Sequence, residues 1–167
     1  AAYQFGDVAD QRISAQMLTT ELGYTFEQTA LSPRPFLGFD YASGDDSSGG
    51  GVETFNQLYP LGHAYLGYID IVGRQNVLDY RTGFSVEPAP RTTAAAHLHL
   101  FRRADQDDAL YNAGGGVVRA GGATSEKDIG TELDLTVKHS FNPRTDLLVG
   151  YSHFFPGQFI EDTGSSK

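Results

Sequence analysis

Apolar and polar residues alternate along much of this chain, most regularly between residues 129 and 155. From Ile129 to Phe141 the odd positions are mainly apolar, and the residues between them are polar or glycine. The charged residues on the even positions are Glu132, Asp134 and Lys138. Side chains two apart lie on the same face of a β-strand, so this segment has one apolar and one charged face. The pattern predicts a hairpin whose apolar face contacts either a protein core or lipid.

The same period of two residues predicts six antiparallel strands and therefore an all-β fold. The predicted strands cover about 14 to 28, 35 to 43, 76 to 87, 92 to 103, 129 to 141 and 146 to 155. The first of these strands is the least regular, because its alternation breaks before Leu18.

The connections between these strands alternate between short and long. The short turns contain Pro33, Pro88 and Pro143, which are spaced 55 residues apart. Proline cannot donate to a sheet ladder, so it marks turns and edges. The long connections, about 44 to 75 and 104 to 128, are rich in glycine. This asymmetry is typical of outer-membrane barrels, with short periplasmic turns and long extracellular loops, and favours a lipid-facing barrel over a soluble antiparallel sheet.

Composition narrows the possible functions. The net charge is −9 and no basic stripe is present, which argues against a nucleic-acid partner. Without cysteine the chain has no disulfide framework, thiolate zinc site or cysteine nucleophile. No apolar run approaches the roughly 18 residues of a membrane helix, whereas barrel strands need only about 9 to 11 alternating residues.

Several segments of the chain are recognisable as motifs: FDYASGD (39–45), TFNQLYPLGHAYLGY (54–68), VGRQN (72–76), DALY (108–111), IGTELD (129–134), GYSHF (150–154) and GQFI (157–160). Together they resemble the C-terminal part of the alginate-export family of outer-membrane β-barrels. The resemblance extends from about residue 34 to 164. It implies a Gram-negative outer-membrane channel that passes an alginate-like exopolysaccharide or small solutes passively. The implied partners are outer-membrane lipid and lipopolysaccharide, the solute, and other subunits of an envelope assembly.

The family resemblance implies more strands than the six predicted here. Six strands would leave sheet edges with unsatisfied backbone groups in lipid. The chain also stops at Gly164-Ser165-Ser166-Lys167, where such barrels have a closing strand with a terminal aromatic residue. We therefore expect residues 1–167 to be part of a single barrel domain that lacks its closing strand. Phe141 and Phe155 are expected near the periplasmic and outer rims.

The charged and histidine residues of the predicted inward face are the candidate pore-lining residues. They are Glu21, Asp40, Asp79, Arg81, His97, His99, Arg103, Glu132, Asp134 and Lys138. Polar side chains inside a barrel tune conductance and selectivity. Alternatively, they form structural ion pairs between neighbouring strands, such as Asp40 or Asp79 with Arg81. Their mixed charge is not the basic wall that polyanionic alginate requires, so the substrate stays open.

Other chemistry is weakly supported by the sequence. His97 and His99 share a strand face, but no third metal ligand is marked, and the acidic clusters at 45–46 and 105–108 lack the EF-hand pattern. No phosphate-binding loop or nucleophile elbow occurs. We therefore predict no enzyme activity, metal or cofactor.

Two alternatives remain open from the sequence. Residues 59–72 are rich in aromatic residues and glycine, and they either fold inward to constrict a pore or extend its wall above the membrane. For the whole chain, the alternative to a channel is a structural or adhesive outer-membrane β-protein that belongs to a larger surface assembly.

Overall fold

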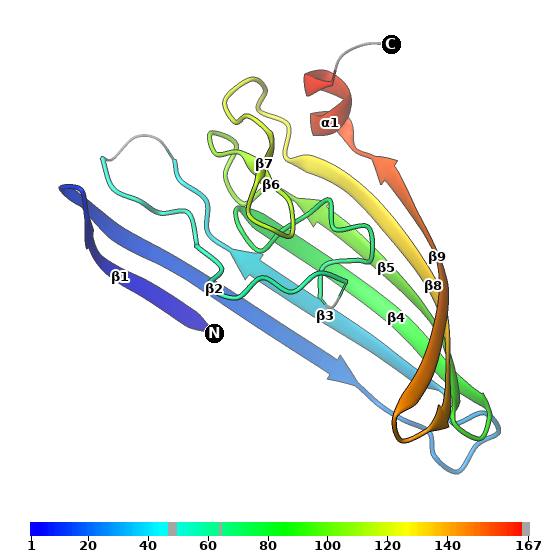
Figure 1. Ribbon diagram of the computed structural model, residues 1–167. Helices are drawn as coiled ribbons and strands as arrows, with labels where there is room; N and C mark the ends of the chain where they lie inside the picture. The colour runs from blue at the N-terminus through cyan, green and yellow to red at the C-terminus, as the bar shows by residue number, and fades with distance from the viewer. Residues whose placement is uncertain (47–49, 64, 165–167) are drawn as a thin grey trace.

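A computed structural model describes residues 1–46, 50–63 and 65–164, and it is an all-β structure with one short helix. Seven antiparallel strands form the main sheet in chain order β1-β2-β3-β4-β5-β8-β9 (Figure 1). These strands are β1 (Ala2–Val8), β2 (Gln11–Gly23), β3 (Arg34–Ala42), β4 (Val77–Ala89), β5 (Thr92–Arg102), β8 (Asp128–Asn142) and β9 (Thr145–Pro156). Strands β6 (Leu110–Tyr111) and β7 (Val117–Arg119) form a separate pair, and helix α1 (Gln158–Thr163) follows β9.

The antiparallel all-β class and the six predicted strands are confirmed, but the main sheet has one strand more. The prediction missed β1, which has only seven residues and loses its alternation at Gly6 and Asp7. Strand β2 begins earlier and ends earlier than predicted. Its ladder nevertheless continues beyond Gly23, because the N–H groups of Tyr24 and Phe26 donate to the carbonyls of Pro35 and Pro33.

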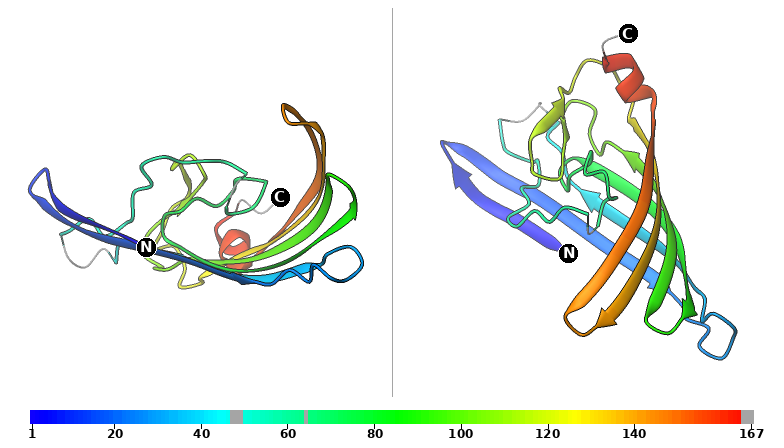
Figure 2. Two further views of the ribbon diagram at one scale, coloured as in Figure 1. Left: turned by 90° about the horizontal axis from the view of Figure 1, so that it is seen from below. Right: turned by 45° about the vertical axis from the view of Figure 1, so that its right-hand side comes forward.

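The described strands form an open, curved sheet with β1 and β9 at its edges (Figure 2). The two long connections lie on its concave side. We call residues 43–76, between β3 and β4, the inner loop, and residues 103–127, between β5 and β8, the second loop. The short connections and the three regularly spaced prolines lie at the opposite end of the sheet from these loops. The β1–β2 turn at Ala9 and Asp10 is also short but lies at the loop end.

The convex face of the sheet is mainly apolar from β3 to β9. The register aligns the apolar residues in rows across neighbouring strands; Leu22 pairs with Leu37, and Leu98 pairs with Leu133. The exposed large apolar residues of this face include Tyr3, Phe5, Leu18, Leu22, Leu37, Tyr80, Phe84, Leu100, Leu135, Val137, Phe141, Leu147, Val149, Tyr151 and Phe155. A face of this size and composition is not covered by any described segment of the chain.

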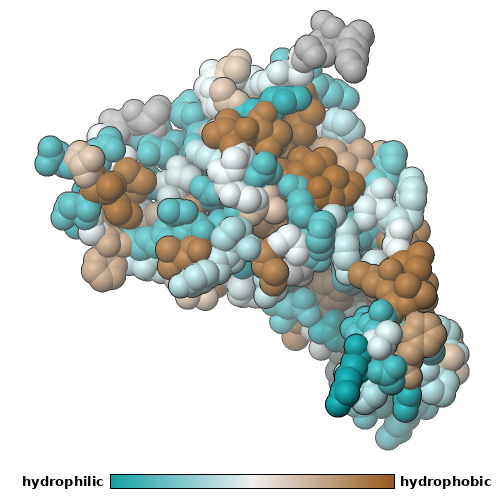
Figure 3. All heavy atoms as spheres, viewed as in Figure 1, coloured by the Kyte–Doolittle hydropathy of each residue, from teal (hydrophilic) through white to brown (hydrophobic). Residues whose placement is uncertain are grey.

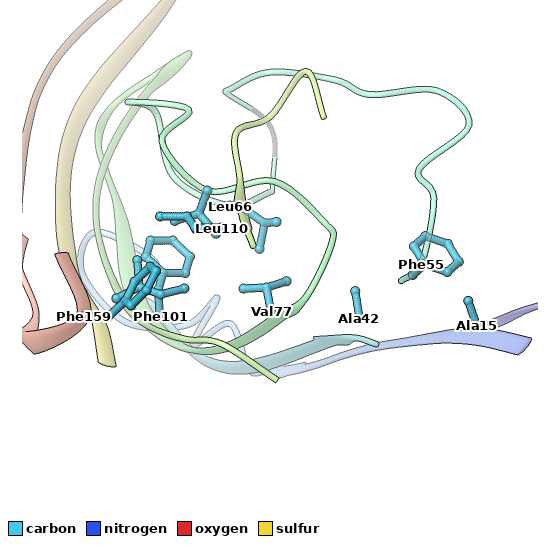
Figure 4. Packing of buried hydrophobic residues seen from close by; sticks show 10 residues of the cluster. Ala15, Ala42, Phe55, Leu66, Val77, Phe101, Leu110 and Phe159 are labelled. Atoms are coloured by element: carbon cyan, nitrogen blue, oxygen red, sulfur yellow. The ribbon is translucent and has the colours of Figure 1, made fainter. Parts of the chain in front are cut away.

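The buried core lies on the concave side, between the sheet and the loops. Ala15, Ala42 and Val77 of the strands face Phe55, Leu66 and Leu110 of the loops (Figure 4). Phe159 of α1 closes the cluster beside Phe101. From the loop side, apolar side chains form separate patches among polar ones (Figure 3). In the described part of the chain no helix has the length and apolar character needed to cross a bilayer.

Candidate functional site

Polar side chains on the concave face form rows that cross the sheet. One row runs through Glu21, Gly38, Arg81, His99 and Glu132 on consecutive strands, and the next through Phe36, Gly83, His97 and Asp134. Neighbouring strands lie about 4.8 Å apart, so neighbouring side chains within a row reach one another. Gly38 makes room for this contact, because a Cβ at this position would overlap the Arg81 side chain.

Three arginines and two carboxylates form a connected network on this face. Arg81 Nη1 donates to Asp40 Oδ2, and its Nη2 lies 3.5 Å from Glu21 Oε2. Arg34 Nη2 donates to Glu21 Oε1 at 2.7 Å. Arg74, from the inner loop, lies with Nη2 2.7 Å from Asp40 Oδ1. Asp40 therefore joins an arginine of the sheet to an arginine of the loop.

Most acidic side chains of the concave face are more deeply buried than the arginines. The residues Asp40, Asp79, Glu132 and Asp134 are at most 1% exposed. The side chains of Arg34, Arg74 and Arg81 are 38%, 17% and 12% exposed, and Glu21 is the one acid of this network with similar exposure, at 38%. Among these charged groups, solvent on the concave side therefore contacts three guanidinium groups and the Glu21 carboxylate, although carboxylates outnumber arginines along these strands.

The buried acids hold neighbouring groups of the protein in place. His99 Nδ1 lies 2.8 Å from Asp79 Oδ2, and the His99 ring stacks on Phe101 with centroids 5.3 Å apart. Asp134 accepts a hydrogen bond from the Ser152 hydroxyl. These contacts are short pairs between adjacent strands, so Asp79 and Asp134 support the wall rather than face the solvent.

Two of the contacts that fix the inner loop to the concave face involve buried carboxylates. The Ile69 N–H donates to Glu132 Oε1 at 2.9 Å, and Arg74 binds Asp40 as described above. Gly67 has a φ of +83° and lies so near Glu132 that a Cβ would overlap its carboxylate. Of the two paths left open by the sequence, the described residues of 59–72 therefore take the inward one.

Three of the ten candidates belong neither to the arginine network nor to the group formed by the buried acids and His99. Lys138 pairs with Asp146 at 2.9 Å near the short-turn end, and His97 packs edge-on against Phe36 with centroids 5.2 Å apart. Arg103 lies just after β5, inside the second loop.

The Arg103 guanidinium holds the second loop together. It donates to the backbone carbonyls of Gln106, Asp108, Thr124 and Glu126. Its Cζ lies 3.7 Å from the centre of the Phe159 ring. Burial lowers the pKa of this guanidinium from its ordinary value, while the nearby aspartates oppose that effect. Arg103 thus contacts loop carbonyls and α1 rather than the open concave surface.

The acidic clusters of the loops also have protein partners. Asp108 Oδ2 accepts hydrogen bonds from the Thr54 hydroxyl at 2.6 Å and from the Asp45 N–H at 3.1 Å, and Oδ1 accepts one from the Tyr111 hydroxyl at 2.7 Å. Within residues 1–46, 50–63 and 65–164, no three His, Asp or Glu side chains are arranged to hold a metal ion. Asp108 connects the inner loop with the second loop.

Sequence reasoning missed Arg34 and Arg74 as members of this site. Arg34 has the same parity as Asp40, which places it on the polar face, but it is adjacent to the Pro33 turn and was not assigned to a strand. Arg74 lies in an irregular loop, where no periodic pattern indicates the direction of a side chain.

A family model described as "Alginate export" matches residues 1–167, the whole chain. The resemblance seen in the separate motifs is thereby confirmed and extended to both ends of the chain. A search of curated proteins found no match.

Proposed function

Since this chain belongs to the alginate-export family, a transport family of the outer membrane, we propose that it forms part of the wall of a passive channel for an acidic, alginate-like exopolysaccharide or small anionic solutes. In this proposal the convex face contacts lipid and the concave face lines water. The loops lie at the extracellular end and the short turns at the periplasmic end.

The dimensions and polarity of the strands support a membrane location. A tilted strand needs about 9 to 11 residues to cross a bilayer, and β3, the shortest strand from β2 to β9 in the main sheet, has nine residues. Lipid is a suitable solvent for the mainly apolar convex face, because the interior strands β2 to β8 of the main sheet are paired with a neighbouring strand on both sides. Phe141 and Phe155 lie on this face near its opposite ends, as interfacial aromatic residues do.

The single observation that supports an anionic substrate is the difference in solvent exposure between the arginines and most of the acids. Carboxylates outnumber arginines along the wall, which would disfavour a polyanion if all charges faced the water. Four of these carboxylates are almost completely buried, whereas the three guanidinium groups remain accessible. Arginine binds carboxylates through paired donors, so the accessible surface suits uronate groups.

The inner loop supports a channel of restricted width. Its anchors at Glu132 and Asp40 hold Ile69 and Arg74 against the concave face. A loop in this position fills space that water would otherwise occupy. It also places Arg74 next to Arg81, since both guanidinium groups bind Asp40. We infer that the proposed channel is narrowest where the inner loop crosses the concave face.

Planar bilayers containing the full-length protein test this function directly. We expect ion conductance, a reversal potential that favours anions in a salt gradient, and current blockage by oligouronate but less by a neutral oligosaccharide of equal length. Cation selectivity without oligouronate blockage would contradict the anionic substrate. A correctly inserted protein without conductance would instead favour the structural or adhesive role.

A further inference from the structure

Two neighbouring cavities lie beside the inner loop and share one partition. The first, of about 340 Å³, lies between the loop and the wall and is lined by Glu21, Arg81 and His97. The second, of about 260 Å³, lies along the loop itself and is lined by Phe55, Leu58 and Tyr59. Tyr65 and Arg74 line both cavities. Both volumes are near the lower end of the range for small-ligand sites.

Tyr65 and Arg74, which separate the two cavities, are held in place by Asp40 of the sheet. Arg74 Cζ lies 5.1 Å from the centre of the Tyr65 ring, and the same guanidinium binds Asp40 at 2.7 Å. An arginine held in this way fixes the orientation of an aromatic ring through a cation–π contact. Tyr65 nevertheless remains 56% exposed, so its ring is positioned by protein on one side and accessible to a ligand.

The two cavities differ in chemistry. The first presents the guanidinium groups of Arg74 and Arg81 beside the Glu21 carboxylate. The second presents mainly aliphatic and aromatic carbon, including Tyr59, which is 92% exposed, with Asp70 and Arg74 also in its lining. A pyranose ring has a comparable division, because its faces carry C–H groups and its edges carry hydroxyl or carboxylate oxygens. Aromatic faces bind the C–H groups, and arginine binds the carboxylates.

We propose that Tyr65 is a sugar-stacking residue at the junction of the two cavities, where it positions an acidic polysaccharide. One sugar ring packs on Tyr65 from the apolar cavity, and the carboxylate of an adjoining sugar binds at Arg74 and Arg81. This inference rests on the proposed channel function. The accessible arginines next to the ring are the reason to assign an acidic saccharide rather than an apolar ligand to this site.

Residence times of single oligosaccharides in the full-length channel test the role of Tyr65. The probes are an oligouronate and a neutral oligosaccharide of equal length. We expect Tyr65→Leu to shorten the blockage by both probes roughly five- to tenfold, as for the loss of one ring contact, and Tyr65→Phe to leave it nearly unchanged. Arg74→Gln should shorten blockage by the oligouronate more than blockage by the neutral probe.

Tyr151→Leu is the matched control, because Tyr151 is a similarly exposed tyrosine on the convex face. It should leave the residence times of both probes unchanged. A conducting wild-type channel that is blocked by oligouronate, and whose Tyr65→Leu variant has the same residence times, would overturn this inference alone. If Tyr65→Leu changed the open-channel conductance but not the residence times, the inference would also be overturned, because Tyr65 would then affect the width of the channel without binding the sugar. A wild-type protein without conductance would overturn the proposed function itself.

Discussion

Glu132 of strand β8 accepts a hydrogen bond from the backbone N–H of Ile69, 63 residues earlier in the chain, at 2.9 Å. The bond joins a completely buried carboxylate of the sheet to the inner loop. An irregular loop makes few backbone hydrogen bonds of its own, so such an anchor controls how often the loop leaves the wall.

Replacement of Glu132 by alanine should release the inner loop. A hydrogen bond contributes about 1 kcal/mol, so we expect the Ile69 amide to exchange with solvent hydrogen about fivefold faster. Hydrogen-exchange mass spectrometry of the described inner-loop peptides measures this change. Glu132→Gln retains an acceptor oxygen and is the control. Unchanged exchange in the alanine variant would show that the loop is held elsewhere.

Gly67→Ala should displace the same loop from the side of the loop itself. An added Cβ would overlap the Glu132 carboxylate, and the φ of +83° is strained for alanine by about 1 kcal/mol. Gly122→Ala is the control, because Gly122 has a φ of +72° with nothing within 4 Å of its Cβ position. We expect faster proteolysis of the inner loop in Gly67→Ala only. If Gly67→Ala and Gly122→Ala increased proteolysis of the inner loop equally, backbone strain alone would explain the result.

Arg81→Gln should reduce anion selectivity and also destabilise the sheet. Asp40 would keep only Arg74, and Glu21 only Arg34. Removing one partner of a buried pair costs about 3 kcal/mol. The reversal potential should shift toward cations, and the free energy of unfolding should fall by about that amount. Arg144→Gln, in the exposed β8–β9 turn, should change neither quantity. If both variants behaved alike, Arg81 would have no special role in selectivity.

Leu135 and Thr136 are adjacent in β8 and test which face contacts lipid. Leu135 lies on the convex face and Thr136 on the concave face. Lysine on the lipid face near the middle of a strand costs about 2–4 kcal/mol, whereas a lumen position tolerates it. We expect Leu135→Lys, but not Thr136→Lys, to lower the free energy of unfolding from lipid vesicles by this amount, measured by guanidinium titration. The opposite order would place the concave face against lipid.

Tyr111 should ionise at a higher pH than a solvent-exposed tyrosine because it lies between the two loops. Burial is the main cause that raises its pKa to about 12, and the Asp108 carboxylate, which accepts a hydrogen bond from its hydroxyl, adds to the effect. The pKa is raised above the ordinary value of 10.0, so the stabilisation is fully present below pH 10.0 and is lost between about 10 and 12. The tyrosinate absorbance of the wild type minus that of Tyr111→Phe should rise near pH 12. A difference that rises near pH 10 would show that Tyr111 is solvated.

The sequence was sufficient to predict the faces of the strands. Glu132 and Asp134 share one face, and Leu133 and Leu135 share the other, because backbone geometry alone makes side chains alternate along a strand. The prolines likewise marked one end of the sheet correctly, since they cannot donate to the ladder.

The exposure of the charges could not be predicted in the same way. The burial of Asp40 and Glu132 depends on the inward path of the inner loop, which has no period and is held by Arg74 and Ile69. Arg103 has the parity of His99, but the register shifts after Phe101 and β5 ends at Arg102. Parity therefore stops being informative one residue before Arg103.

The shared carboxylate of Asp40 has an evolutionary consequence. Its two oxygens bind Arg81 of the sheet and Arg74 of the loop, so the loss of the acid would leave Arg74 without its counter-charge and Arg81 with the more distant Glu21 alone. A relative with a neutral residue at position 40 is therefore expected to have replaced both arginines. These three positions should vary together across the family, although 34 residues separate the first from the second along the chain.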